Sequence, residues 1–185
     1  SAHTVAINIA SVFFILPLSF GLAAATRIGN LVGEKNLLQA KYASHVAVLI
    51  CLIGAIVNTI IILAFREALV SLYTADVAVM AIAINLLLFA AIFQIPDGMQ
   101  MGALGSLRGY KDTFAPMLML ILTYWFIALP AGYYLTYHGI SSNSLGPAGI
   151  WIGMITGLAA FACLIIPRLN YIANKFIART NPELP

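Results

Sequence analysis

Residues 78–104 read AVMAIAINLLLFAAIFQIPDGMQMGAL, a stretch that carries a single charge, that of Asp97. A helix needs about 20 apolar residues to cross the hydrocarbon core of a bilayer, so this stretch predicts a membrane span. An ionised side chain at that depth costs a few kcal/mol or more, and such residues usually face a wet cavity and mark an ion or proton path. Asp97 is therefore the first candidate functional residue. The alternative is a structural carboxylate paired with a neighbouring helix.

The composition of the whole chain agrees with a membrane location. Of the 185 residues 62% are hydrophobic and 8% are charged, whereas soluble domains carry about 25% charged residues. A soluble protein of this length has too little interior to bury so much apolar surface. The formal net charge is +3, but the basic residues cluster between apolar spans, where they act as topology signals. We therefore expect a lipid bilayer as partner and no nucleic acid.

Five stretches meet the length requirement, and we predict an all-α integral membrane protein with five transmembrane helices. The predicted spans are His3 to Thr26, Tyr42 to Ala64, Val77 to Leu104, Phe114 to Tyr137 and Ala148 to Ile166. A transmembrane β-barrel is excluded, because its strands alternate lipid-facing and lumen-facing residues and these runs do not. The predicted organisation is a helical bundle over residues 1–167 and a cytoplasmic basic tail over 168–185. Because the chain starts at Ser1, next to a span, we expect it to be a piece of a longer polypeptide.

The basic residues predict the orientation of the spans. Eight of the nine lie in the first connection, the third connection and the tail, namely Arg27, Lys35, Lys41, Arg108, Lys111, Arg168, Lys175 and Arg179. Basic residues are enriched on the cytoplasmic side of membrane proteins. The N-terminus of the segment is thus predicted outside and its C-terminus in the cytoplasm.

Several polar residues fall within the spans around Asp97. Pro96 removes a backbone donor, so we expect it to bend or open the third span at the carboxylate. Gln94 and Gln100 add amide dipoles beside the acid, and Asn8 of the first span is a candidate for the same cavity. The alternative is that each amide simply bonds a neighbouring helix. The cluster as a whole favours a binding site.

Other features indicate packing rather than catalysis. Cys51 and Cys163 lie in apolar segments and predict neither a disulfide framework nor a metal site. No catalytic or phosphate-binding motif is found, so an enzyme is not expected, nor is a cofactor. Glycines four residues apart after Asp97 and in the fifth span predict close helix packing. Tyr124 and Trp125 belong either to an interfacial aromatic belt or to the wall of a pocket for a flat cation. His45 is interpreted as a packing residue rather than a proton relay.

Four segments, in this order and at these separations, resemble the multidrug and toxic compound extrusion (MATE) transporters. They are AHTVAIN (2–8), RIGNLVGE (27–34), GSLRGYKD (105–112) and LGPAGIW (145–151). The resemblance covers nearly the whole chain and implies helices eight to twelve of a twelve-helix protein. The N-terminal lobe and the first helix of the C-terminal lobe would then lie outside this chain and act as its partners.

The resemblance also implies a function. Members of this family export cationic, often aromatic drugs in exchange for Na⁺ or H⁺ across the cell inner membrane. An acid in the tenth helix belongs to the cation site of the sodium-coupled type, and by position this acid is Asp97. The family often has a tyrosine one turn before the acid, where this chain has Phe93, so a hydroxyl ligand is missing. The usual partner glutamate lies in the helix that this chain lacks.

We expect Asp97 to hold either a proton or a cation. The lobes would rock between outward and inward openings as the occupancy of Asp97 changes. Loading can drive transport only if the two conformations bind the ion with different affinity. Two alternatives remain open at this point. One is a flippase of related fold that moves lipid-linked oligosaccharides, and the other is a membrane scaffold in which Asp97 pairs with a basic residue of a partner helix.

Overall fold

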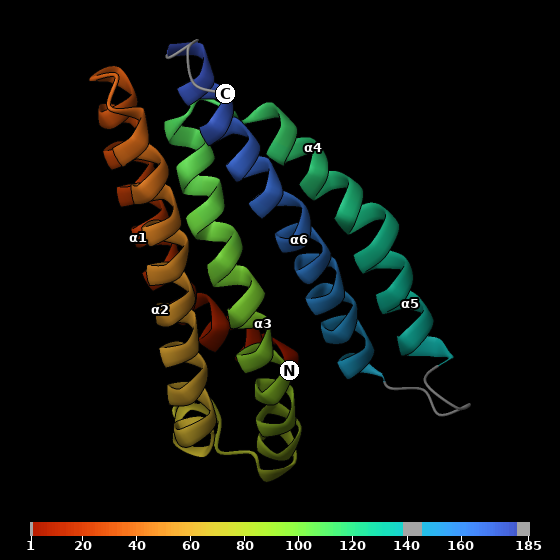
Figure 1. The fold of residues 1–185 in the computed structure, drawn as a ribbon. Coiled ribbons are helices and arrows are strands. Elements are labelled where there is room, and N and C mark those ends of the chain that lie inside the picture. The colour runs from red at the N-terminus through yellow and green to blue at the C-terminus, as the bar shows by residue number, and fades with distance from the viewer. Residues whose placement is uncertain (1, 139–145, 181–185) are drawn as a thin grey trace.

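The computed structural model describes residues 2–138 and 146–180, and these form helices and short turns (Figure 1). The elements are α1 (Ala2–Gly33), α2 (Leu37–Ser71), α3 (Val77–Gly109), α4 (Phe114–Thr123), the π-helix η1 (Tyr124–Ala128), α5 (Leu129–Tyr137) and α6 (Pro147–Thr180). The elements α4, η1 and α5 follow one another without a break and make one rod. Within the described ranges, five helical rods are long and apolar enough to cross a membrane. The all-α prediction with five spans is confirmed.

Most helices are longer than the predicted spans. The first, second, third and fifth continue to Gly33, Ser71, Gly109 and Thr180. An α-helix bonds its own backbone and needs no lipid, so it runs on past the apolar segment that the span prediction measured. The last helix passes Pro167 without ending, so Arg168, Lys175 and Arg179 lie on α6 rather than on a separate chain segment. Residues 181–185 of the predicted tail, and 139–145 of the fourth connection, lie outside the described residues.

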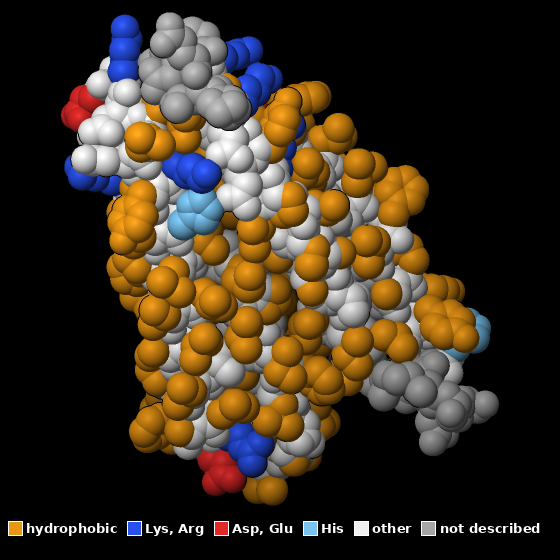
Figure 2. Space-filling view, viewed as in Figure 1, with side chains coloured by type: hydrophobic (Ala, Val, Ile, Leu, Met, Phe, Trp, Pro, Cys, Tyr) orange, Lys and Arg blue, Asp and Glu red, His pale blue; other side chains and the backbone are white. Residues whose placement is uncertain are grey.

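The helix α3 occupies the centre of the bundle. It packs against α1, α2 and α6, and the rod of α4, η1 and α5 packs chiefly on α6 (Figure 1). Lys and Arg side chains gather at the end of the bundle where α1, α3 and α6 terminate, and hydrophobic side chains cover its length (Figure 2). Any residue near the middle of α3 is therefore enclosed on several sides.

Glycines permit two of the closest helix contacts. Gly105 of α3 lies against the backbone carbonyl of Gly21 in α1, and Gly153 of α6 lies against the backbone of Gly132 in α5. A Cβ atom at Gly105 or Gly153 would overlap the facing backbone. The glycine spacing predicted such close approaches, and the structure confirms them.

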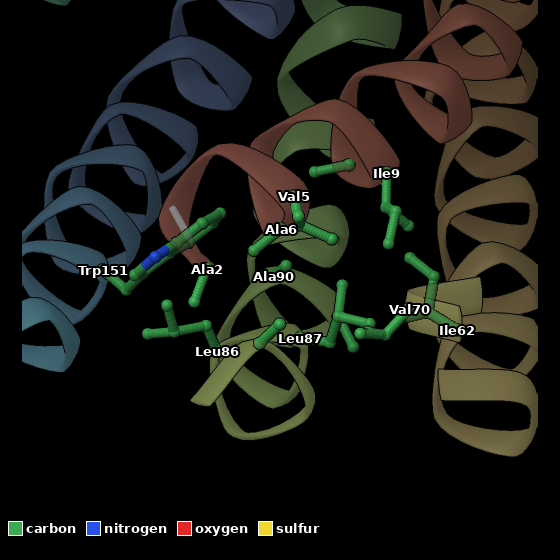
Figure 3. Close-up of a cluster of buried hydrophobic side chains, with 13 residues drawn as sticks. Ala2, Val5, Ala6, Ile9, Ile62, Val70, Leu86, Leu87, Ala90 and Trp151 are labelled. Atoms are coloured by element: carbon green, nitrogen blue, oxygen red, sulfur yellow. The ribbon is translucent and has the colours of Figure 1, made fainter. Parts of the chain in front are cut away.

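An apolar cluster near the start of α1 joins α1, α2, α3 and α6. Trp151 of α6 joins Ala2 and Ile9 of α1 and Leu86 and Leu87 of α3 in this cluster (Figure 3). Trp151 is almost completely buried. This cluster fixes α6 against α1 and α3 beside the segment that holds Asp97.

Proline and asparagine together connect α1 and α2. Pro17 lacks an N–H, so the carbonyl of Phe13 one turn earlier loses its helical partner. The Nδ2 atom of Asn58 in α2 donates to that carbonyl oxygen at 2.8 Å. A polar residue within the membrane thus satisfies a backbone group that proline left open, as polar side chains commonly do in bundles.

The first and third helices end in the same way, on related sequences. Residues 29–36 read GNLVGEKN and residues 105–112 read GSLRGYKD. Lys35 and Lys111 adopt left-handed φ angles of 60° and 63°. The next residue in each case donates its N–H back to a leucine carbonyl, Asn36 to Leu31 and Asp112 to Leu107, both at 2.9 Å. This is the Schellman cap, with lysine at the position that glycine usually takes.

Candidate functional site

The candidate site is built on one face of α3. Gln94, Asp97 and Gln100 follow one another at intervals of three residues, which places them on neighbouring turns of the same helical face. All three side chains are buried, and Asp97 is 3% exposed. The surrounding helices therefore remove the carboxyl group from solvent and from lipid alike.

The hydrogen bonds of these side chains leave oxygen atoms without partners. Gln100 Nε2 donates to Asp97 Oδ1 at 2.6 Å, and Gln94 Nε2 donates to the carbonyl oxygen of Ala10 in α1 at 3.2 Å. Within residues 2–138 and 146–180, Asp97 Oδ2, Gln94 Oε1 and Gln100 Oε1 accept no hydrogen bond. Buried polar atoms are rarely left in this condition. Three acceptor oxygens on one helix face suit a proton or a small cation.

A cavity of about 330 Å³ adjoins this face. Its walls come from Ile7, Ala10, Ser11 and Phe14 of α1, from Phe93, Gln94 and Asp97 of α3, and from Trp151 and Met154 of α6. Most of the wall is apolar, and the polar groups gather at Gln94 and Asp97. A site of this kind binds an apolar or aromatic body and presents one charge to it.

Aromatic rings stand at one side of the cavity. The ring of Phe93 meets that of Trp151 edge to face, with centroids 6.0 Å apart, and His3 meets Trp151 at 5.9 Å. The indole Nε1 of Trp151 is buried and has no hydrogen-bond partner in the described chain. Phe93 thus contributes a ring and no hydroxyl, as its sequence position implies.

Tyr124 of η1 lines a cavity next to the one beside Asp97, and sequence reasoning had not decided whether it lines a pocket or belongs to an interfacial belt. This second cavity has a volume of about 390 Å³, and Met154 lines both cavities. Trp125 points elsewhere, since it is 66% exposed. Of the two aromatic residues that were candidates for a pocket wall, the structure places Tyr124 in one.

The π-helix has a local cause that the sequence does contain. Pro130 has no N–H, so the regular pattern of helical bonds is interrupted just before it. The N–H of Leu129 donates to the carbonyl of Tyr124, five residues earlier. One residue is thereby inserted into the turn, which rotates the positions before it relative to those after it. Such single π-turns are frequent at functional sites.

The other candidate residues lie as follows. Asn8 is exposed on α1 and is not among the residues that line the cavity. We expected Pro96 to bend or open the third span; α3 runs as one helix from Val77 to Gly109, so the turn at Asp97 is not opened. His45 contacts the carbonyl of Lys41 at 2.8 Å and Asn170 Oδ1 at 2.7 Å, at the basic end of the bundle. The structure therefore brings together Phe93, Gln94, Asp97 and Gln100, and leaves Asn8 and His45 apart from them.

A metal site made of several strong ligands is not found in the part of the chain that the structure describes. No three His, Cys, Asp or Glu side chains gather there. Asp97 provides one carboxylate, so a cation at this position would depend on amide oxygens and on groups from outside the chain. Such a ligand set suits a reversibly bound ion rather than a resident metal.

Comparison with known proteins places this geometry in context. The family model described as MatE matches residues 1–134. The chain is 40% identical over 172 residues to multidrug resistance protein NorM of Photobacterium profundum, covering 93% of this chain and 38% of NorM. It is 37% identical over 177 residues to multidrug resistance protein PmpM of Pseudomonas aeruginosa, covering 96% of this chain and 37% of PmpM. The chain thus spans well under half the length of these relatives.

A solved structure shares the fold. The crystal structure of the eukaryotic MATE transporter AtDTX14 matches with a TM-score of 0.83 and 22% sequence identity, over 96% of this chain and 40% of that chain. At this identity the likeness concerns the fold alone. It agrees with the expectation that the five helices form a portion of a larger transporter.

Proposed function

Because this chain belongs to the MATE family, we propose that it is part of a multidrug efflux antiporter that exports organic cations in exchange for Na⁺ or H⁺. The observation that carries the proposal is the buried carboxyl of Asp97, whose Oδ2 atom has no protein partner among the described residues and borders a cavity. Relatives whose names are multidrug resistance proteins support the same reading.

In the proposed mechanism Asp97 binds the coupling ion. Burial favours the neutral, protonated carboxyl, whereas a cation beside it favours the carboxylate. The unpartnered oxygens of Gln94 and Gln100 lie on the same face and add ligands for a cation. Ion loading would shift the lobes between outward and inward openings to the extent that the two states bind the ion differently.

Tyr124 would take the place of the hydroxyl that Phe93 does not provide. It lies on a different helix from Asp97 and lines the neighbouring cavity, and Met154 forms part of the wall of both cavities. Phe93 and Trp151 would offer ring faces and edges to an aromatic cationic drug. The drug and the ion would then compete for the neighbourhood of one carboxyl group.

The remaining ligands and partners are expected from outside this chain. The N-terminal lobe would close the other side of the substrate path, and the first helix of the C-terminal lobe would bring the partner glutamate. We place the protein in the inner membrane, with the basic end of the bundle in the cytoplasm, because basic residues concentrate at that end. The segment would then enter from the outside and end inside.

The two alternatives have less support. A scaffold role requires Asp97 to pair with a basic residue of a partner helix, whereas the relatives named multidrug resistance proteins support transport. A flippase for lipid-linked oligosaccharides would favour a basic cavity, and the residues lining the cavity beside Asp97 include no Lys or Arg. Drug efflux therefore fits the site better than either.

The test uses the full-length transporter that contains this segment, reconstituted in liposomes with a fluorescent cationic dye. Dye movement is measured with an imposed Na⁺ gradient, with an imposed H⁺ gradient, and with neither. The proposal expects transport that one of the gradients drives. Dye movement that is the same with and without each gradient would overturn ion-coupled efflux. Transport of a lipid-linked oligosaccharide in place of the dye would favour the flippase.

A further inference from the structure

A further hollow lies between α3 and α6, apart from the cavities lined by Asp97 and by Tyr124. Its volume is about 580 Å³. All residues that line it are apolar in type, and Ile92, Pro96 and Met99 of α3 face Ala159, Cys163 and Pro167 of α6 across it. Ala159, Cys163 and Pro167 are exposed. The hollow is therefore an open groove on the side of the bundle, and its walls offer a ligand only apolar surface and a thiol.

The length of the groove matches one leaflet of a membrane. Its lining on α6 runs from Ile155 to Pro167, which corresponds to about 18 Å at the helical rise of about 1.5 Å per residue. The hydrocarbon core of a bilayer is about 30 Å thick, so one leaflet is about half of that. An acyl chain of a membrane lipid fits both the length and the apolar character.

A basic seam closes the groove at the cytoplasmic end of α6. Asn170 and Asn174 continue the groove-lining face of α6, because they follow Ile166 at intervals of four residues. Lys41 Nζ donates to Asn174 Oδ1 at 2.8 Å, and His45 Nε2 lies 2.7 Å from Asn170 Oδ1. These two contacts join α2 to α6. On the face seen in Figure 2, a Lys or Arg side chain and a His side chain adjoin above a band of hydrophobic side chains.

The positive charge of this seam is not compensated by an acid. The partner of Lys41 is a neutral amide. Across residues 2–138 and 146–180, the one ion pair joins Arg168 and Asp112. Lys41 is only partly buried and His45 is exposed, so both remain accessible to an anion. Basic residues at the cytoplasmic side of helix clefts attract the headgroups of anionic lipids.

We propose that the α3–α6 groove and the seam of Lys41 and His45 form a binding site for an anionic phospholipid. One acyl chain lies in the groove, against Pro96 and Pro167, and the phosphate lies at the Lys41 ammonium. Pro96 lines the groove and Asp97 lines the other cavity, so the lipid chain packs on a different face of α3 from the ion site. The proposal does not depend on which drug or ion the transporter moves.

The test measures lipid retention by native mass spectrometry of the full-length transporter. The protein is exchanged into detergent with equal amounts of phosphatidylglycerol and phosphatidylcholine. Wild type is expected to retain phosphatidylglycerol at least about fivefold better. Lys41→Gln should remove this preference while retention of phosphatidylcholine stays the same, and Ala159→Trp, which fills the groove, should lower the retention of both lipids.

Lys35→Gln serves as the matched control, since Lys35 is a basic residue at the same end of the bundle and neither lines the groove nor joins the seam. It should behave as wild type. Equal losses in Lys35→Gln and Lys41→Gln would mean diffuse surface charge and would overturn the site. Displacement of phosphatidylglycerol by soluble glycerol phosphate would also overturn it, because the site would then bind phosphate alone.

A second measurement needs no variant and therefore does not depend on folding of a mutant. Phosphatidylglycerol with a photoactivatable group in one acyl chain is crosslinked to wild type, and the labelled peptides are mapped. Labels are expected within residues 92–99 and 155–167. An even distribution of labels over all lipid-facing helices would contradict a defined site.

Discussion

Asp97 and Asp112 lie fifteen positions apart, near the middle and just beyond the end of α3, and their surroundings are opposite. Both oxygens of Asp112 accept from Arg168, at 2.8 Å from Nε and 3.1 Å from Nη2. Asp97 accepts one bond, from the neutral amide of Gln100, and its other oxygen has no partner in the described residues. The aspartate at position 112 is held by two hydrogen bonds to an arginine, whereas the aspartate at position 97 keeps one carboxyl oxygen without a partner.

This difference separates structural from functional charge in the bundle. A bidentate pair with arginine is geometrically specific and joins the α3–α4 turn to α6. An open, buried carboxyl stabilises nothing by itself, because desolvation is costly when no charged partner compensates it. Such a carboxyl in the middle of a membrane is understandable if it binds an ion or a proton for part of a cycle.

The largest expected effect comes from exchanging the two carboxyls for amides, one at a time. Asp97→Asn should reduce ion-driven dye efflux by at least about tenfold, which corresponds to about 1.4 kcal/mol, and should leave the melting temperature nearly unchanged. Asp112→Asn should lower the melting temperature and leave efflux per folded molecule intact. Liposome transport and thermal unfolding of the full-length protein give both readouts. Undiminished efflux in Asp97→Asn would remove Asp97 from the mechanism.

A smaller effect is expected from the phenol of Tyr124. Tyr124→Phe should weaken ion-driven efflux by no more than about threefold, which is less than the loss of a direct hydrogen bond of about 1 kcal/mol would give, because no hydrogen bond joins Tyr124 to Asp97 within the described residues. Phe93→Tyr in that background should restore part of the loss, because it returns a hydroxyl one turn before the acid. Trp125→Phe is the control, since Trp125 is exposed. Equal losses in the Tyr124 and Trp125 variants would contradict a specific role.

The ion pair of Arg168 with Asp112 should show a modest coupling energy. Arg168 and Asp112 side chains are 28% and 16% exposed, so solvent weakens their attraction. A double-mutant cycle with Asp112→Asn and Arg168→Met should give a coupling energy of about 1 kcal/mol in the free energy of unfolding. Unfolding of the full-length protein in denaturant measures it. A coupling energy of zero would mean that the pair does not fix the turn to α6.

The smallest effect concerns the backbone that presents Asp112 to Arg168. Lys111 precedes Asp112 and has a φ of 63°, which costs a residue with a Cβ about 1 kcal/mol. Lys111→Gly relieves this strain but frees the unfolded chain, so the net change in stability should stay within about 1 kcal/mol. Lys111→Val should destabilise clearly more. Comparable melting temperatures for both variants would contradict the strained cap.

The sequence predicted the spans, the burial of Asp97 and the close glycine contacts, because length, hydropathy and small residues set these directly. It did not predict which face of each helix looks inward. A helix that is apolar all round has no polar side to fix its rotation, so Asn8 was expected in the cavity and lies exposed. The hydrogen bond from Gln94 Nε2 to the carbonyl oxygen of Ala10 in α1 could not be predicted from the sequence either.

Two further features needed coordinates for a similar reason. The direction of Tyr124 depends on a π-turn before Pro130, which changes the phase of the helix, and a proline in a sequence indicates a kink without saying that it contains a π-turn. The Schellman caps at Lys35 and Lys111 depend on left-handed lysines, which residue preferences disfavour. The related segments GNLVGEKN and GSLRGYKD were visible in the sequence, but their shared role appears only once both are seen to end a helix.

The most direct test of the account follows the carboxyl group itself. Infrared difference spectra of the full-length transporter are recorded as Na⁺ is added at fixed pH and as pH is changed without Na⁺. We expect a carboxyl band that changes with one of these ions, persists in Asp112→Asn and disappears in Asp97→Asn. A carboxyl signal that responds to neither ion, or that survives unchanged in Asp97→Asn, would contradict the claim that Asp97 changes its occupant during transport.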